Sequence, residues 1–233
     1  MIDDAPSLGH QHRDISGGWM RAAVFGVSDG LVSNVSLILG FAGASAAVDT
    51  VRLAGIAGLV AGAVSMAAGE YVSVRAQAEL LQRELDLERH SLHRNPELEV
   101  QELIGIYTKR GFDADVAEAM ARNAMATPEL ALETHAREEI GVDPESLGSP
   151  VLAAFASFVA FTLGAVLPLL PWFWIDGTGA IIASVVLGAV GAFGVGLALG
   201  SFTGRSKIYS ASRQLLIAAI AAAVTTAIGY WVG

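Results

Sequence analysis

The chain contains no cysteine among its 233 residues, so disulfide bonds and thiolate metal sites are excluded. Charged residues are also scarce, at 16% of the chain, and the 14 basic residues are outnumbered by 23 acidic ones. The resulting net charge of −9 argues against nucleic acid as a partner and favours cations. The first twenty residues contain no apolar core of a signal peptide, so we expect no cleaved signal, with the first apolar span directing insertion.

Catalytic signatures are missing as well. The sequence contains no C-x-x-C, H-E-x-x-H, P-loop, dinucleotide-binding or nucleophile-elbow motif. We therefore expect a protein that is not an enzyme and holds no cofactor, and a membrane enzyme is the least favoured reading.

Long apolar runs are what the chain has in abundance. Hydrophobic residues make up 53% of it, and five runs each have roughly the twenty residues that cross a bilayer as a helix. The predicted spans are residues 22–48, 51–74, 150–174, 177–203 and 214–232, with the first break around Asp49 and Thr50. The predicted fold class is therefore an all-α membrane protein with five transmembrane helices.

The acidic residues gather between the second and third spans. Sixteen of the 23 lie between Glu79 and Glu145. We predict that the helix of span two continues to about Leu92 and that shorter helices follow, separated at Asn95–Pro96, at Gly111 and at Thr127–Pro128. The last of them should end at Gly141. The predicted organisation is an N-terminal segment (1–21), spans one and two (22–74), a helical acidic insert (75–148) and spans three to five (149–233).

Basic residues near the spans indicate how the chain is oriented. Those on one side are Arg13, Arg21, Arg75, Arg205, Lys207 and Arg213. The other side holds only Arg52, so the positive-inside rule places the N-terminus and the acidic insert in the cytoplasm. Arginine exceeds lysine and Ala and Gly are abundant, which favours a bacterial plasma membrane; a eukaryotic chain would lie in a vacuolar-type membrane.

Asp29 is the only charged residue in the first span. A carboxylate within a membrane helix costs a few kcal/mol, about 3 on insertion scales, so it usually faces an ion, a partner or a polar path. Ser33 and Ser36 share its helix face at spacings of four and three. We favour a functional site over the alternative, a protonated residue that serves helix packing.

Met66 and Glu70 share a face of the second span. Methionine in an apolar helix is most often a packing residue, but its sulfur beside carboxylate oxygens would suit a metal such as Fe²⁺. Glu70 lies near the cytoplasmic edge, where it is either part of a path or a plain interfacial residue. Glycines at four-residue spacing, Gly58 and Gly62 in span two and Gly196, Gly200 and Gly204 in span four, are read as helix-packing positions.

Carboxylates of the acidic insert fall in pairs, two of them along predicted helix faces and the third, Glu138 with Glu139, at the end of the last helix. The pairs are Glu84 with Glu88, Glu99 with Glu102, and Glu138 with Glu139, and the candidate imidazole ligands are His90, His93 and His135. On several short helices, such groups can converge into a cation site. The alternative is a solvated acidic face without a metal.

Four stretches of the chain carry a resemblance to a known family: residues 24–34 (VFGVSDGLVSN), 65–74 (SMAAGEYVSV), 136–144 (AREEIGVDP) and 148–150 (GSP). The first three resemble the first membrane helix, the second membrane helix and the end of the cytoplasmic metal-binding domain of the vacuolar iron transporter family. Residues 148–150 (GSP) resemble the entry to its third span, and the likeness covers nearly the whole chain after about Gly17.

The resemblance implies a homodimer in a lipid bilayer that moves Fe²⁺, and often Mn²⁺, out of the cytosol in exchange for protons. It implies that Asp29 and Met66 line a path at the dimer interface, with Glu70 in the same motif. The implied cytoplasmic metal ligands are Glu88, Glu99, Glu102 and Glu139.

The chain departs from the family pattern in two places. Ser91 stands where another glutamate is common, and His135 and Ala136 stand where a methionine pair can occur. The cytoplasmic site is thus expected either to have fewer ligands or to use His135.

The function expected from the sequence is proton-coupled export of Fe²⁺, Mn²⁺ or both. The alternative is a non-transporting membrane sensor or scaffold with an acidic cation-binding domain. A scaffold needs the acidic insert but has no use for Asp29, and that residue separates the two readings.

Overall fold

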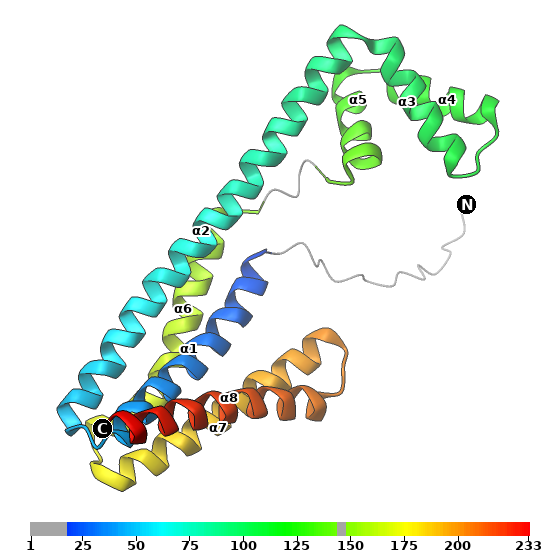
Figure 1. Ribbon diagram of the computed structural model, residues 1–233. Helices are drawn as coiled ribbons and strands as arrows, with labels where there is room; N and C mark the ends of the chain where they lie inside the picture. Colours follow the sequence, from blue (N-terminus) through cyan, green and yellow to red (C-terminus); the bar gives the residue numbers. More distant parts are fainter. Residues whose placement is uncertain (1–17, 144–147) are drawn as a thin grey trace, which may run out of the picture.

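A computed structural model describes residues 18–143 and 148–233, and the regular structure within them is helical (Figure 1). Arg13, with nearly all of the predicted N-terminal segment, lies outside the described residues. The elements in chain order are α1 (Gly18–Gly43), α2 (Val48–Arg94), α3 (Pro96–Lys109), α4 (Ala114–Ala124), α5 (Pro128–His135), the π-helical turn η1 (Ala136–Ile140), α6 (Pro150–Leu169), the 3₁₀ turn η3 (Leu170–Phe173), α7 (Gly177–Thr203) and α8 (Lys207–Val232).

Five of the described helices are long and apolar enough to cross a membrane, which confirms the all-α class and the number of spans. The spans are Trp19–Gly43, Val48–Arg94, Pro150–Phe173, Gly177–Thr203 and Lys207–Val232. The first break lies earlier than predicted, because α1 ends at Gly43 and Asp49 lies in the first turn of α2. A carboxylate is favourable at that position, next to the positive end of the helix dipole.

Helix α2 extends well beyond a bilayer. Its 47 residues correspond to roughly 70 Å at the rise of an α-helix, against about 30 Å of hydrocarbon. The predicted continuation of span two to about Leu92 is confirmed, since α2 ends at Arg94. Figure 1 shows α2 leaving the bundle of spans, with α3, α4 and α5 at its far end.

The turns of the insert follow the predicted stop signals. Asn95 and Pro96 end α2 and begin α3, and Gly111, at φ +97°, follows α3. Thr127 caps α5 by accepting a hydrogen bond from the Leu130 amide (3.2 Å), and Gly141, at φ +75°, ends η1. Buried residues of α3 and α4 form a small core of their own: Val100, Leu103, Tyr107, Ala117, Ala121 and Ala124.

Helix α1 lies at the centre of the spans and packs against α2, α6, α7 and α8. Its closest neighbour is α6, because both helices use glycine where they cross. A Cβ on Gly26 would lie 2.8 Å from the Ser157 carbonyl oxygen, and Cβ atoms on Gly30 and Gly164 would overlap the backbone of Phe161 and Val27. The position of α1, and hence of Asp29, thus depends on backbone-to-backbone contact with α6.

The packing interpretation of the other spaced glycines is confirmed, with one exception. Gly62 faces the Phe161 ring, Gly58 faces Leu37, and Gly196 and Gly200 let α8 approach α7. Gly204 instead ends α7 in a left-handed conformation, at φ +69°, which glycine adopts without strain.

At the end of the spans remote from the insert, Arg52 connects three segments. Its guanidinium lies 3.1 Å from both Asp49 and Asp176, and its Nε donates to the Trp172 carbonyl. The Trp172 indole in turn donates to Ser184 (2.8 Å), so α2, η3 and α7 are joined at this end.

Replacing Gly30 by Ala should destabilise the fold, because the added Cβ would overlap the Phe161 backbone. Overpacking of this kind costs about 1–3 kcal/mol. Gly194→Ala on α7 is the matched control, since a Cβ there meets nothing within 4 Å. Thermal unfolding in detergent, followed by tryptophan fluorescence, should show a lower Tm for Gly30→Ala only. Equal Tm values for the two variants would contradict the packing account.

Candidate functional site

The insert brings five of the predicted ligands together. One group consists of Glu88, Glu99 and His135, the other of Glu99, Glu102 and Glu139. Within each group one ligand atom of every residue lies within 4.8 Å of the others. The residues come from α2, α3, α5 and η1, so the cluster exists only when the insert is folded.

The inner part of this cluster is removed from solvent. His135 is fully buried and Glu99 is 4% exposed, whereas Glu102 and Glu139 lie at the surface. A wholly solvated acidic face is therefore wrong for the inner residues. Ser91, which stands where the family pattern commonly has glutamate, donates its hydroxyl proton to Glu99 Oε1 and orients that carboxylate.

The imidazole of His135 lies between oxygen atoms of α5 and α3. Its Nδ1 lies 2.8 Å from the Ala131 carbonyl, which can only accept, so the proton is on Nδ1. Nε2 then faces the Glu99 carbonyl oxygen at 3.4 Å and Glu99 Oε2 at 3.7 Å. Nε2 can therefore act in two ways: it donates a second proton to these oxygens, or its lone pair binds a cation.

Glu88 lacks a partner at the same place. Its Oε1 is buried and has no hydrogen-bond partner among the described residues. Desolvation raises the pKa of Glu88 to about 7, the carboxylates of Glu139, Glu99 and Glu102 add to the rise, and His135 opposes it. The pKa of Glu139 is raised as well, first by desolvation and then by Glu102.

Other candidates of the insert lie outside the cluster. Glu138 forms an ion pair with Arg110, which leaves Glu139 as the η1 carboxylate that joins the ligands. Glu84 lies outside the cluster, although Glu88, with which it was predicted to share a helix face, belongs to it. His90 and His93 are exposed on α2. Of the three candidate histidines only His135 joins it, because α5 packs back against α2 while the other two point to solvent.

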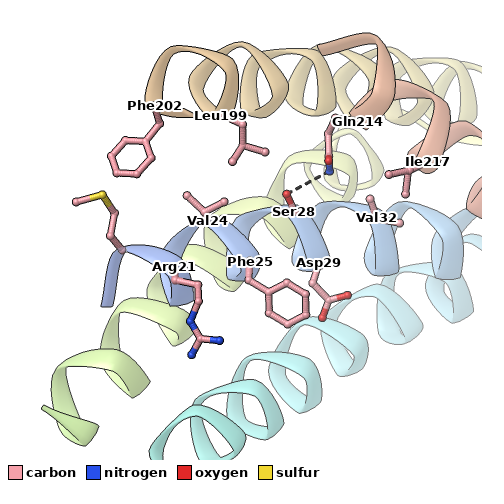
Figure 2. Close-up of a pocket in the computed structure, with 11 residues that line it drawn as sticks. Arg21, Val24, Phe25, Ser28, Asp29, Val32, Leu199, Phe202, Gln214 and Ile217 are labelled. Carbon is pink, nitrogen blue, oxygen red and sulfur yellow. Dashed lines mark hydrogen bonds between the residues drawn. The ribbon is translucent and has the colours of Figure 1, made fainter. Parts of the chain in front are cut away.

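Asp29 lines a cavity of about 570 Å³ between α1, α7 and α8. The polar lining comes from Arg21, Ser28, Asp29 and Gln214. Gln214 donates a hydrogen bond to Ser28 (3.2 Å), and Figure 2 shows the Asp29 carboxylate leaving α1 on the other side. The side chain of Asp29 is exposed on the single chain.

The predicted polar stripe on α1 is divided. Ser33 is exposed like Asp29, but its hydroxyl donates to the Asp29 backbone carbonyl (2.6 Å). Ser36 is buried, at 6% exposure, and its hydroxyl has no partner among the described residues. Asp29 and Ser33 therefore form the part of the stripe that is open on one chain.

Met66 and Glu70 have separate surroundings. Met66 packs against the apolar cluster of Ala63, Phe161 and Ala165, away from the cavity that Asp29 lines. Glu70 is 12% exposed and lies 3.4 Å from the guanidinium of Arg21 on α1. Within one chain, the predicted path residues thus do not share one pocket.

Sequence reasoning missed several polar contacts of the spans. The sequence gives Arg21 a role only in orientation, and Gln214 only as the start of span five. It assigns no role to Asn34, whose side chain donates to the Ala165 carbonyl (2.7 Å) and whose Oδ1 is buried without a partner among the described residues. All three could have been identified from the sequence, because each is a polar residue that lies within an apolar run or at its end.

Comparison with known proteins gives a consistent result. The model of the VIT family matches residues 20–230. The chain is 37% identical to the vacuolar iron transporter of Acanthamoeba castellanii, an alignment that covers 95% of this chain and 82% of that protein. It is 32% identical to vacuolar iron transporter 1 of Eucalyptus grandis (91% and 87% covered) and of Arabidopsis thaliana (89% and 84%). Together with its five apolar helices, these matches show that the chain is a multi-pass membrane protein that belongs to the VIT family.

Proposed function

We propose that this protein is a metal ion transporter that exports Fe²⁺, Mn²⁺ or both from the cytosol in exchange for protons. Relatives named vacuolar iron transporters at 32–37% identity support metal transport as its task. The ions are its cargo, and the protein works as a homodimer in a plasma membrane or, in a eukaryote, a vacuolar-type membrane.

The inner cluster carries the proposal. Glu88, Glu99 and His135 offer two carboxylates and one imidazole within 4.8 Å of one another, and Oε1 of Glu88 is buried without a hydrogen-bond partner among the described residues. An imidazole nitrogen beside carboxylate oxygens suits Fe²⁺ better than Mg²⁺ or Ca²⁺, which prefer oxygen alone, and the carboxylates also suit Mn²⁺. Glu102 and Glu139, at the surface, are where the ion first meets the cluster.

The membrane part supports transport rather than sensing. Asp29 is exposed on an apolar helix of the single chain, where contact with lipid would cost roughly 3 kcal/mol. A second copy of the chain covering this face would remove that cost and would place two Asp29 carboxylates on one path. The ion then passes from the cytoplasmic insert along Glu70 to Asp29, with Met66 as a soft ligand from α2.

Replacing Asp29 by Asn should abolish metal transport, because the amide keeps the shape of the side chain but removes the charge that holds a desolvated cation. Uptake of Mn²⁺ into proteoliposomes is the measurement. Asp115→Asn, an exposed carboxylate in the first turn of α4, is the matched control and should transport normally. Normal transport by a folded Asp29→Asn protein would favour the sensor or scaffold.

Replacing Glu88 by Gln should raise the stability of the metal-free protein and reduce its stabilisation by metal. The pKa of Glu88 rises from 4.5 to about 7 on folding, so the folded state binds more protons in that window. The free energy of unfolding therefore falls as the pH rises from 4.5 to about 7, and above pH 7 this contribution is fully lost. Glutamine carries no charge and avoids this loss.

Thermal unfolding at pH 8 with and without Mn²⁺ tests both effects. The Glu88→Gln protein should have the higher Tm without metal and a smaller gain with it. In the native protein, the gain with metal should grow as the pH rises through 7, because bound ligands must be deprotonated. A metal-induced gain that Glu88→Gln leaves intact would show that Glu88 is not a ligand.

A further inference from the structure

The ion pair between Arg21 and Glu70 lies at one end of the proposed path. Glu70 is four residues beyond Met66 on α2, and Arg21 is eight residues before Asp29 on α1. Arg21 also lines the cavity that reaches Asp29, and Figure 2 shows both side chains leaving α1 on the side away from Gln214. The pair therefore joins the two helices that carry the path residues, on the side of the insert.

Arg21 brings a permanent positive charge to this place. A guanidinium stays protonated at any pH the protein meets, so it can be neutralised only by an anionic partner. Glu70 is that partner, and its side chain is 12% exposed whereas that of Arg21 is 66% exposed. The carboxylate is thus fixed in the protein, and the guanidinium has room to move away from it.

We propose that Arg21 is a tethered competitor for the cation at Glu70 and so determines which ions enter the path. This role rests on the proposed transport function. Without metal, the guanidinium of Arg21 pairs with the Glu70 carboxylate. A divalent cation displaces the guanidinium, because a cation with two charges interacts more strongly with the carboxylate. Na⁺ and K⁺ carry the same single charge as the guanidinium but none of its hydrogen bonds, so they do not displace it. Arg21 contacts Glu70 and not Asp29, so its proposed role is to determine specificity.

The test measures Mn²⁺ uptake into proteoliposomes at low and high K⁺, with choline keeping the ionic strength constant. In the native protein the KM for Mn²⁺ should not depend on K⁺. Arg21→Gln should lower that KM at low K⁺ by at least about threefold, the scale expected when a partly exposed ion pair no longer competes. In Arg21→Gln the KM should then rise with K⁺, while the maximal rate stays near that of the native protein.

Two further variants separate charge from structure. Arg21→Lys keeps the tethered cation and should behave as the native protein does. Arg75→Gln removes a positive charge one turn beyond Glu70, from an exposed pair with Glu79, and should change neither KM nor its dependence on K⁺. A structural role for Arg21 would instead lower the maximal rate and leave the KM unchanged.

The outcomes distinguish this inference from the function on which it rests. An unchanged KM in Arg21→Gln, or a KM that remains independent of K⁺, overturns the role of Arg21 while native Mn²⁺ uptake upholds transport. A native protein that carries no divalent cation overturns the proposed function and this role together.

Discussion

Repulsion among desolvated carboxylates is the interaction on which the arrangement of the insert depends. Glu88 and Glu99 leave water, Glu102 and Glu139 stand beside them, and the His135 imidazole lies within reach of Glu88 and Glu99. Folding therefore gathers carboxylates away from water, and the pKa of Glu88 rises, first through desolvation and then through the neighbouring carboxylates. In the proposed transporter a divalent cation or protons supply the balance, so that metal and proton compete for one set of oxygen atoms.

The same competition extends into the membrane part with different partners. Glu70 is balanced by Arg21, whereas Asp29 lies exposed on α1 of the single chain. Helix α1 is fixed by backbone contact with α6 at Gly30, and the opposite end of the spans is joined through Arg52. The close backbone contacts and the Arg52 contacts thus lie apart from the Arg21–Glu70 ion pair, which we propose to be exchangeable.

The sequence predicted what depends on local chemistry. Span number follows from apolar length, and the stop at Gly141 from a conformation that glycine adopts without strain. The convergence of His135 but not His90 could not be read from spacing, since it depends on how α5 packs against α2. The partner of Glu70 was hidden for the same reason, because Arg21 is 49 residues away in the chain and meets it only where α1 and α2 lie side by side.

The central claim is that metal moves in one direction as protons move in the other. Proteoliposomes that hold a pH-sensitive dye and a Mn²⁺-sensitive dye report both flows at once. With an acidic interior and Mn²⁺ outside, the account predicts Mn²⁺ entry that grows with the pH difference, accompanied by alkalinisation of the interior. Mn²⁺ entry that ignores the pH difference, with no opposing proton flow, would contradict the account and would indicate a channel or a uniporter.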